Sequence, residues 1–400
     1  MIFNTAWFLC FFLVFYFLFW LLPNPKIRFY FTLVSSALFQ FHFASAAGVF
    51  PILVMGLCTY AMALWIARLS TGDPWKKRAF ILALLVPVGG LIGYKYRALL
   101  IGSLAAWVPG GAGNSLQAFA AQPALPLAIS FFTFEFVHYL TDVYHGSKPV
   151  AHPLKFGFFA IFFPSVVAGP IKRFQTFLAQ VEGGIPRPPL EAVVRGLSQV
   201  LLGYFKKLVV ADNATVMIHL LEKNTSGHPL AVALLMALLS IRILVDFSGY
   251  SDIAIGLGRM MGLELPANFN YPYLAANITD FWRRWHMSLS SWIRDYIYIP
   301  LGGSRQGSAR KFLNLLLTMF ICGLWHGAAW HFGLWGIYHG AGLALHNTWE
   351  KTPWSRGWRE SPFSRWAGVA VNNVFVAYGW LLFFYPVNDV VRYTRILFQW

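Results

Sequence analysis

Long apolar runs separated by short polar connections recur along the whole chain. The runs cover residues 6–22, 29–43, 50–67, 79–93, 125–139, 156–168, 231–245, 312–324, 330–345 and 366–385. They are continuous rather than alternating, which favours helices over strands. A helix needs roughly 20 mostly apolar residues to cross a bilayer, and fewer where neighbouring segments shield its ends. The pattern predicts an all-α polytopic membrane protein with about ten transmembrane helices.

Composition and charge agree with a membrane protein. Only 12% of the residues are charged, about half the share in soluble domains. The net charge of +16 comes from short connections between runs, so it indicates membrane orientation rather than nucleic-acid binding. Lys26 and Arg28 precede the second run and a second basic cluster spans 68–78, which places the N-terminus outside the cytoplasm. No basic residues precede the first run, so we expect a retained helix rather than a cleaved signal.

Three stretches interrupt the apolar pattern. Residues 110–126 and 182–191 are rich in glycine or proline and predict loops. The third, 265–310, is more polar. At the C-terminus, 387–400 predicts either an interfacial helix or the start of another span.

The third stretch contains an amphipathic segment with a tryptophan-rich face. Asn277 is a suitable helix cap, and apolar positions then recur at spacings of three and four up to Pro300. The spacing predicts one helix over 278–299 that lies at the membrane interface or against the spans. His286 follows Trp285 on the apolar side of this helix.

Three histidines lie in the apolar stretch 321–340: His326, His331 and His339. A metal site is disfavoured because no Asp or Glu lies among them. His326 is followed by Gly327 and two alanines, which leave room for a substrate. It is either a structural histidine bonded to a neighbouring helix or a base in a polar cavity.

Several motifs, taken together and in order, resemble one known family. They are AGPIKRF (168–174), GYFKKLVVADN (203–213), FSGYSDIAIGLGRMMG (247–262), NFNYPY (268–273), DFWRRWHMSLSSWIRDYIYIPLGG (280–303) and WHGAAWHFGLWGIYHG (325–340). They are similar to the membrane-bound O-acyltransferases, most of all to the bacterial branch with the alginate O-acetyltransferase membrane subunit and the D-alanyl transfer protein of teichoic acids. The resemblance implies one domain over 1–400, with N-terminal spans in 1–108, the family core in 125–346 and C-terminal spans in 347–400. It also implies interfacial or re-entrant helices, in addition to the spans, around a central tunnel.

The resemblance implies catalytic roles for His326, which occupies the WHG motif, and for His286, which occupies the WRRWH motif. The residues implied to bind substrate are Trp285, Arg294, Asp295, Trp325, His331 and His339. No metal and no bound cofactor are implied.

The implied reaction moves an acyl group, most simply acetyl, across the bacterial inner membrane. The donor is a thioester at the cytoplasmic face, either acetyl-CoA or an acyl carrier protein. The acceptor is a hydroxyl of an exported polysaccharide or of a partner transferase. Expected partners are a periplasmic acetyltransferase, glycan-export proteins and membrane lipids, with no nucleic acid.

Two alternatives stay open at the level of sequence. The same fold could move D-alanine from a carrier protein to teichoic acid. A membrane transporter would show inverted repeats and broken helices in matching halves, and the sequence has neither feature.

Overall fold

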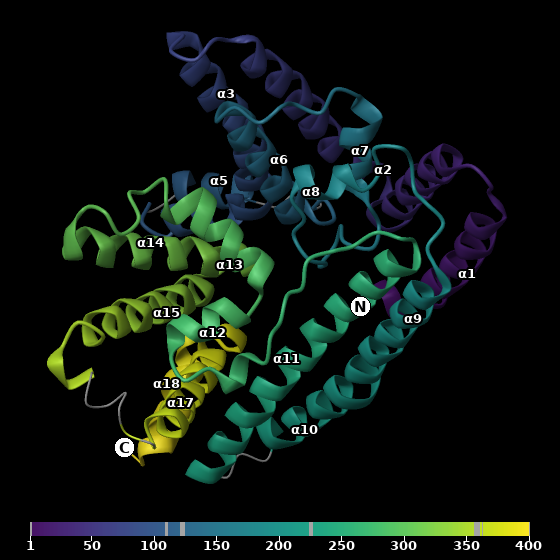
Figure 1. The fold of residues 1–400 in the computed structure, drawn as a ribbon. Helices are drawn as coiled ribbons and strands as arrows, with labels where there is room; N and C mark the ends of the chain where they lie inside the picture. The colour runs from purple at the N-terminus through teal and green to yellow at the C-terminus, as the bar shows by residue number, and fades with distance from the viewer. Residues whose placement is uncertain are drawn as a thin grey trace. The chain divides into compact units, whose positions relative to one another are not determined.

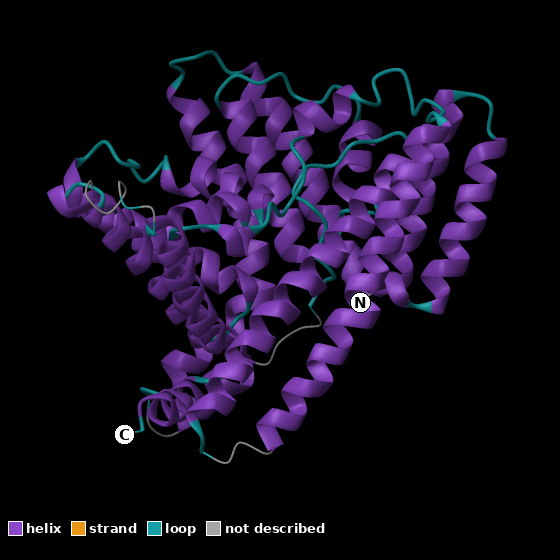
Figure 2. Cartoon of the chain, turned by 60° about the horizontal axis from the view of Figure 1, so that its bottom comes forward, coloured by secondary structure: helices purple, strands orange, loops and turns teal. Residues whose placement is uncertain are grey.

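The computed structural model describes residues 2–108, 111–120, 125–223, 227–355, 361 and 363–399. Over these ranges the secondary structure is helical and contains no strand (Figure 2). The predicted all-α class is therefore confirmed. The chain forms two compact units, one made of Met1–Leu201 with Asp252–Pro266 and the other of Leu202–Ser251 with Ala267–Trp400.

The first unit begins with long apolar helices. Its helices are α1 (Ala6–Leu21), α2 (Pro25–Arg68), α3 (Pro74–Leu91), α4 (Arg97–Ala105), α5 (Gly111–Ala120), α6 (Ile129–Tyr144), α7 (Pro153–Ile161) and α8 (Phe174–Ala179) (Figure 1). Helix α2 is interrupted at Ser45, where φ is 56° and ψ is 173°. The predicted runs 29–43 and 50–67 are thus two helical segments that meet at this residue.

Two sequence expectations for the first unit differ from the structure. The predicted loop 110–126 contains α5, because the good helix formers of its second half, such as Leu116, Gln117 and Ala120, outweigh its glycines. The apolar run 156–168 is helical only as far as Ile161. Continuing the helix would drive the ring of Pro164 into the carbonyl of residue 160. The predicted loop at 182–191 is confirmed up to Pro189, where α9 (Leu190–Tyr204) follows.

Helices α9 and α11 (Pro229–Met260) are divided between the units. The other helices of the second unit are α10 (Asp212–Lys223), α12 (Ile278–Arg284), α13 (Met287–Ile293), α14 (Gly307–His326), α15 (Trp330–Trp349), α17 (Ser364–Phe384) and α18 (Val387–Phe398). Helix α18 carries Asp389, Arg392 and Arg395 among its apolar residues, which favours the interfacial alternative over a further span.

Helices α14 and α15 form a tight antiparallel pair (Figure 1). A Cβ atom on Gly336 would overlap the carbonyl oxygen of Met319, and one on Gly340 would lie 3.0 Å from the Cα of Leu316. The two backbones touch because these positions carry no side chain. This contact fixes the C-terminal end of α14, where His326 lies.

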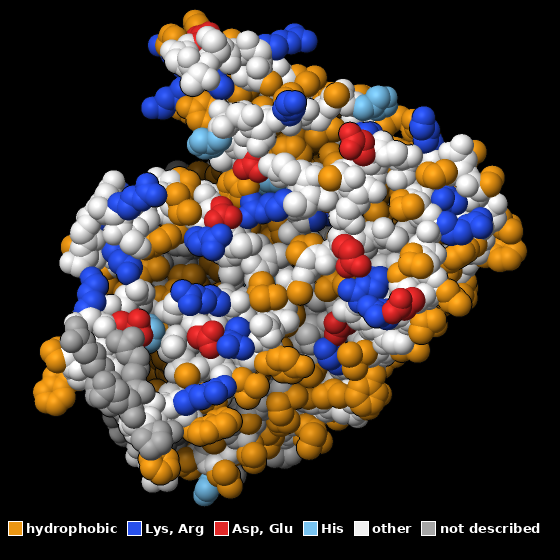
Figure 3. All heavy atoms as spheres, in the orientation of Figure 1, with side chains coloured by type: hydrophobic (Ala, Val, Ile, Leu, Met, Phe, Trp, Pro, Cys, Tyr) orange, Lys and Arg blue, Asp and Glu red, His pale blue; other side chains and the backbone are white. Residues whose placement is uncertain are grey.

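Four helical segments are long and apolar enough to cross a membrane: Pro25–Arg68, Pro74–Ala105, Pro229–Met260 and Ser364–Phe384. Large apolar side chains are also exposed on the shorter apolar helix α1, such as Leu13 (70%) and Phe17 (66%). On the face drawn in Figure 3, hydrophobic side chains lie at the surface over α10 and α11. Such a surface is typical of helices in contact with lipid. A total of about ten crossings stays a prediction.

Candidate active site

The predicted helix over 278–299 is broken at His286, which corrects the expectation of one continuous helix. Helix α12 ends at Arg284, α13 begins at Met287, and a π-helical segment, Arg294–Tyr298, follows. The amphipathic spacing continues across the break, so the sequence pattern alone gives no sign of it. The predicted cap is confirmed, since the Asn277 side chain accepts a hydrogen bond from the Asp280 N–H.

The backbone at the break is strained and firmly held. His286 has φ 42° and ψ 55°, a left-handed conformation that is unfavourable for a residue with a Cβ. The segment beside it supports this geometry, because the Met287 N–H donates to the Asn268 carbonyl at 2.9 Å and the Asn270 N–H donates to the Arg284 carbonyl at 3.0 Å. Strain of this kind concentrates at functional sites.

The His286 side chain is fully buried and belongs to a polar cluster. Its Nδ1 lies 3.3 Å from Oδ1 of Asn268. The same oxygen accepts a hydrogen bond from the Ser288 hydroxyl at 2.6 Å, and the Asn268 amide nitrogen donates to Ser251 at 3.1 Å. We call these four side chains the His286 cluster.

The cluster determines the tautomer of His286, and burial determines its charge. Because the Asn268 amide nitrogen donates to Ser251, its Oδ1 is an acceptor, and the Nδ1 of His286 must carry the proton. Its Nε2 then presents a lone pair, and no hydrogen-bond partner for it exists among the described residues. Burial, and after it the nearby His326, lower the pKa of His286 well below its ordinary value. His286 is therefore a neutral acceptor at physiological pH.

His326 is the last residue of α14 and is half-buried. Its ring contacts Trp335 edge-on at 5.2 Å and Phe383 at 5.0 Å between ring centroids. The Trp325 ring lies 4.8 Å from His326 and 6.0 Å from His286. The structure thus brings His286 and His326, which are separated by 40 positions in the sequence, next to the same tryptophan ring.

His339 lies deeper in the same unit and is fully buried. Aromatic rings surround it: Phe281, Trp282, Trp335, Tyr338, Phe375 and Trp380. Neither of its ring nitrogens has a hydrogen-bond partner in the described part of the chain. His331, at the second position of α15, is half-buried and contacts the ring of Phe332 at 4.2 Å.

The other predicted site residues have different surroundings. Trp285 is buried among aromatic rings, with Phe269 at 5.1 Å and Trp380 at 5.0 Å between centroids. Its surroundings are those of a packing residue next to His286. Arg294 is largely exposed and pairs with the neighbouring Asp295 at 2.9 Å.

Sequence reasoning missed Asn268, Ser288 and Ser251 as site residues. Each falls within a quoted motif, but their role depends on contacts between segments 17 to 20 positions apart. Among the described residues, no group of three or more His, Cys, Asp or Glu could hold a metal ion. The chemistry available in this region is that of imidazole, hydroxyl and amide groups.

Comparisons with known proteins show what the chain is similar to. The sequence profile of the membrane-bound O-acyltransferase family matches residues 8–387. The chain is 38% identical over 279 residues to the probable alginate O-acetylase of Pseudomonas aeruginosa, covering 67% of this chain and 51% of that protein. It is 36% identical over 253 residues to the peptidoglycan O-acetyltransferase of Helicobacter pylori, covering 56% and 48%.

A third relative carries a different name. The teichoic acid D-alanyltransferase of Bacillus subtilis is 30% identical over 271 residues, which cover 64% of this chain and 68% of that protein. The chain spans about half the length of the two acetylating relatives. The family profile, in contrast, covers both histidines of the site and the whole His286 cluster.

Proposed function

Because this chain belongs to the membrane-bound O-acyltransferase family, we propose that it transfers an acyl group, most simply acetyl, from a thioester donor to a hydroxyl acceptor. The proposed acceptor is an exported cell-envelope polysaccharide or a partner transferase that completes the transfer. The names of the acetylating relatives support acetyl as the acyl group.

One observation carries the proposal. His286 is held as a neutral imidazole with an available Nε2, and His326 lies beside the same tryptophan, Trp325. Two imidazoles at one buried site suit proton transfer near neutral pH. The family match adds the reaction class.

In the proposed reaction His326 is the general base. It accepts the proton of the acceptor hydroxyl as that oxygen adds to the thioester carbonyl carbon. The resulting tetrahedral intermediate expels the thiolate when the carbon–sulfur bond breaks. The proton on His326 then passes to the thiolate, so that a thioester and an alcohol give an ester and a thiol. His286 accepts a hydrogen bond through Nε2 from a second hydroxyl or N–H group of the acceptor, and so orients the reacting hydroxyl toward His326.

The chain is a membrane protein by its family and its four long apolar helices. We place it in the bacterial inner membrane as a multi-pass enzyme. The donor, acetyl-CoA or an acyl carrier protein, would arrive from the cytoplasm. A periplasmic acetyltransferase or glycan-export proteins would receive the product. These assignments rest on a thioester donor made in the cytoplasm and an acceptor hydroxyl on the other side of the membrane.

The alternative is D-alanyl transfer, which the similarity to the B. subtilis teichoic acid enzyme favours. One assay separates the two. Mild base releases ester-linked groups from envelope glycans of cells with and without the protein, and the released acid is identified. Protein-dependent acetate supports the main proposal, whereas protein-dependent D-alanine supports the alternative. If neither acid depends on the protein, both proposals are wrong.

A further inference from the structure

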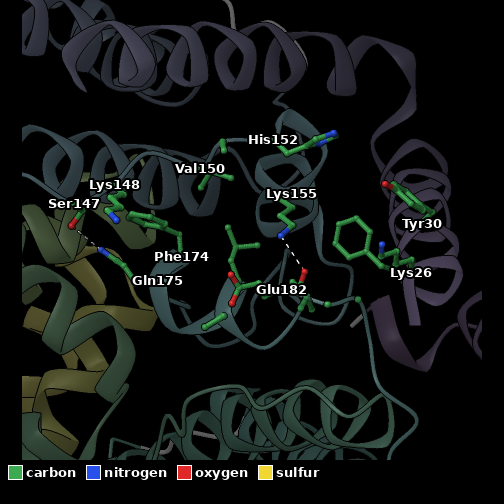
Figure 4. A pocket seen from close by; sticks show the side chains of 17 residues that line it. Lys26, Tyr30, Ser147, Lys148, Val150, His152, Lys155, Phe174, Gln175 and Glu182 are labelled. Carbon is green, nitrogen blue, oxygen red and sulfur yellow. Dashed lines mark hydrogen bonds between the residues drawn. The ribbon is translucent and has the colours of Figure 1, made fainter. Parts of the chain in front are cut away.

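The first unit contains a cavity of about 660 Å³ that the proposed reaction does not use. Four segments surround it: the first turn of α2, the connection 147–152, the first turn of α7, and α8 with the turn that follows it. Figure 4 shows Lys148 on one side of the cavity, Lys26 on the opposite side and Lys155 between them. We call it the lysine cavity.

The lysine cavity has an excess of positive charge. Lys26, Lys148 and Lys155 line it together with a single carboxylate residue, Glu182. The Lys155 ammonium donates to the backbone carbonyl of Glu182 at 3.3 Å, which is a neutral acceptor (Figure 4). Within the described ranges, none of these lysines forms an ion pair. Three ammonium groups from separate segments therefore face one space with their charge largely uncompensated.

The wall beneath these lysines is apolar. Phe29, Val150, Phe174 and Val181 line the cavity and are each less than 10% exposed. Tyr30, beside Lys26, is 49% exposed at the rim. A free inorganic anion would leave this wall unused. A ligand with a negative group and a hydrocarbon part fits both surfaces.

The position of the cavity indicates where such a ligand comes from. Lys26 is in the first turn of α2, a helix long and apolar enough to cross a membrane. The end of a span lies at the depth of the lipid headgroups, where lysines meet phosphate. The ligand would therefore be available from the bilayer itself.

We propose that the lysine cavity binds the headgroup of an anionic phospholipid. The phosphate binds next to the Lys155 ammonium, between Lys26 and Lys148, whose charges attract it from the two sides. The glycerol and the first carbons of the acyl chains pack on the partly exposed Tyr30 and Leu178. The bound lipid contacts the start of α2, the start of α7 and the turn after α8, and by joining them it stabilises the first unit.

The test uses the full chain, purified in detergent and titrated with single lipids by native mass spectrometry. The probes are phosphatidylglycerol, zwitterionic phosphatidylcholine and inorganic phosphate. The variant Lys26→Gln/Lys148→Gln/Lys155→Gln is compared with Lys76→Gln/Lys77→Gln/Arg78→Gln, which removes the same charge from the first turns of α3, outside the cavity. We expect phosphatidylglycerol binding to weaken about fivefold per cavity lysine, or about 100-fold in the triple variant. The α3 control should stay close to wild type.

Three results would overturn the proposal. They are unchanged phosphatidylglycerol binding in the cavity variant, an equal loss in the α3 control, and displacement of the lipid by millimolar inorganic phosphate with the same lysine dependence. The last result would mean that the phosphate is recognised without its lipid. If the glutamine variant does not fold, the Lys→Arg triple variant replaces it. That variant keeps the charge and should retain the preference for phosphatidylglycerol over phosphatidylcholine, and loss of this preference in a folded arginine variant would equally count against the site.

Discussion

The Nδ1 atom of His286 lies 3.3 Å from the Oδ1 atom of Asn268, a residue 18 positions earlier in the chain. This contact sets the proton on Nδ1 and leaves Nε2 as the acceptor. A second bond to the same asparagine stabilises the left-handed backbone of His286, because the Met287 N–H donates to the backbone carbonyl of Asn268. Asn268 is thus a positioning residue for the proposed reaction.

Asn268→Ala should reduce acyl transfer. It removes the acceptor for His286 Nδ1 and frees the imidazole to rotate or change tautomer. Loss of a buried hydrogen-bond partner costs about 1–3 kcal/mol, which corresponds to a rate reduction of about 5- to 150-fold. The measurement is ester content of the glycan at matched protein levels. Asn372→Ala is the matched control, because Asn372 is also buried in the second unit but bonds the Ala275 carbonyl instead. Equal losses in the two variants would contradict the role given to Asn268.

The stability of the protein should depend on pH through His286. Burial lowers its pKa in the folded state, whereas the unfolded chain has the ordinary value of 6.5. Below pH 6.5 the unfolded state binds the extra proton, so the folded state loses stability as the pH falls. The melting temperature in detergent should fall between pH 7.5 and pH 5.5, and it should fall less in His286→Gln. Parallel pH profiles for the two proteins would refute this assignment.

Gly336→Ala should separate α14 from α15 and displace His326. The added Cβ would overlap the Met319 carbonyl, which is backbone and has no room to yield. Overpacking of this kind costs about 1–3 kcal/mol, and both the melting temperature and the ester content should fall. Gly102→Ala is the control, since a Cβ there meets nothing within 4 Å. A Gly336→Ala protein with wild-type stability would show that the two backbones are farther apart than described.

The orientation of the chain can be tested directly. Basic residues gather in the connections at Lys26–Arg28 and at 68–78, and such connections usually lie in the cytoplasm. We therefore predict that these two connections are cytoplasmic and that the N-terminus lies outside. A reporter fused after Lys77 should score as cytoplasmic. A periplasmic signal at this position would reverse the topology and the side on which the donor must bind.

The sequence predicted the helices better than it predicted the site. Continuous apolar runs indicated helices, and the Asn277 cap follows from local chemistry that a single segment contains. The break at His286 could not be predicted. Its amphipathic period continues unbroken, and the hydrogen bonds that stabilise the break come from Asn268 and Asn270 on another segment.

The two histidines illustrate the same limit. His326 and His286 stood out as polar residues in apolar surroundings, and the family motifs singled them out. Both histidines lie next to Trp325 only because of how α13 and α14 pack, and no local sequence pattern contains this packing. His339 was likewise a candidate from the sequence, but its burial among aromatic rings, without a hydrogen-bond partner among the described residues, could not be predicted.

The central claim is that His326 is the base of an acyl transfer, and one comparison tests it most directly. His326→Ala and His331→Ala are produced at matched levels of folded, membrane-inserted protein, and ester-linked acetate on the exported glycan is measured. His331 is the control because it is a half-buried histidine at the start of the next helix. Removal of a general base costs about 10²–10⁴-fold, so acetate should disappear in His326→Ala and fall much less in His331→Ala. Full acetylation by the His326→Ala protein would contradict the mechanism.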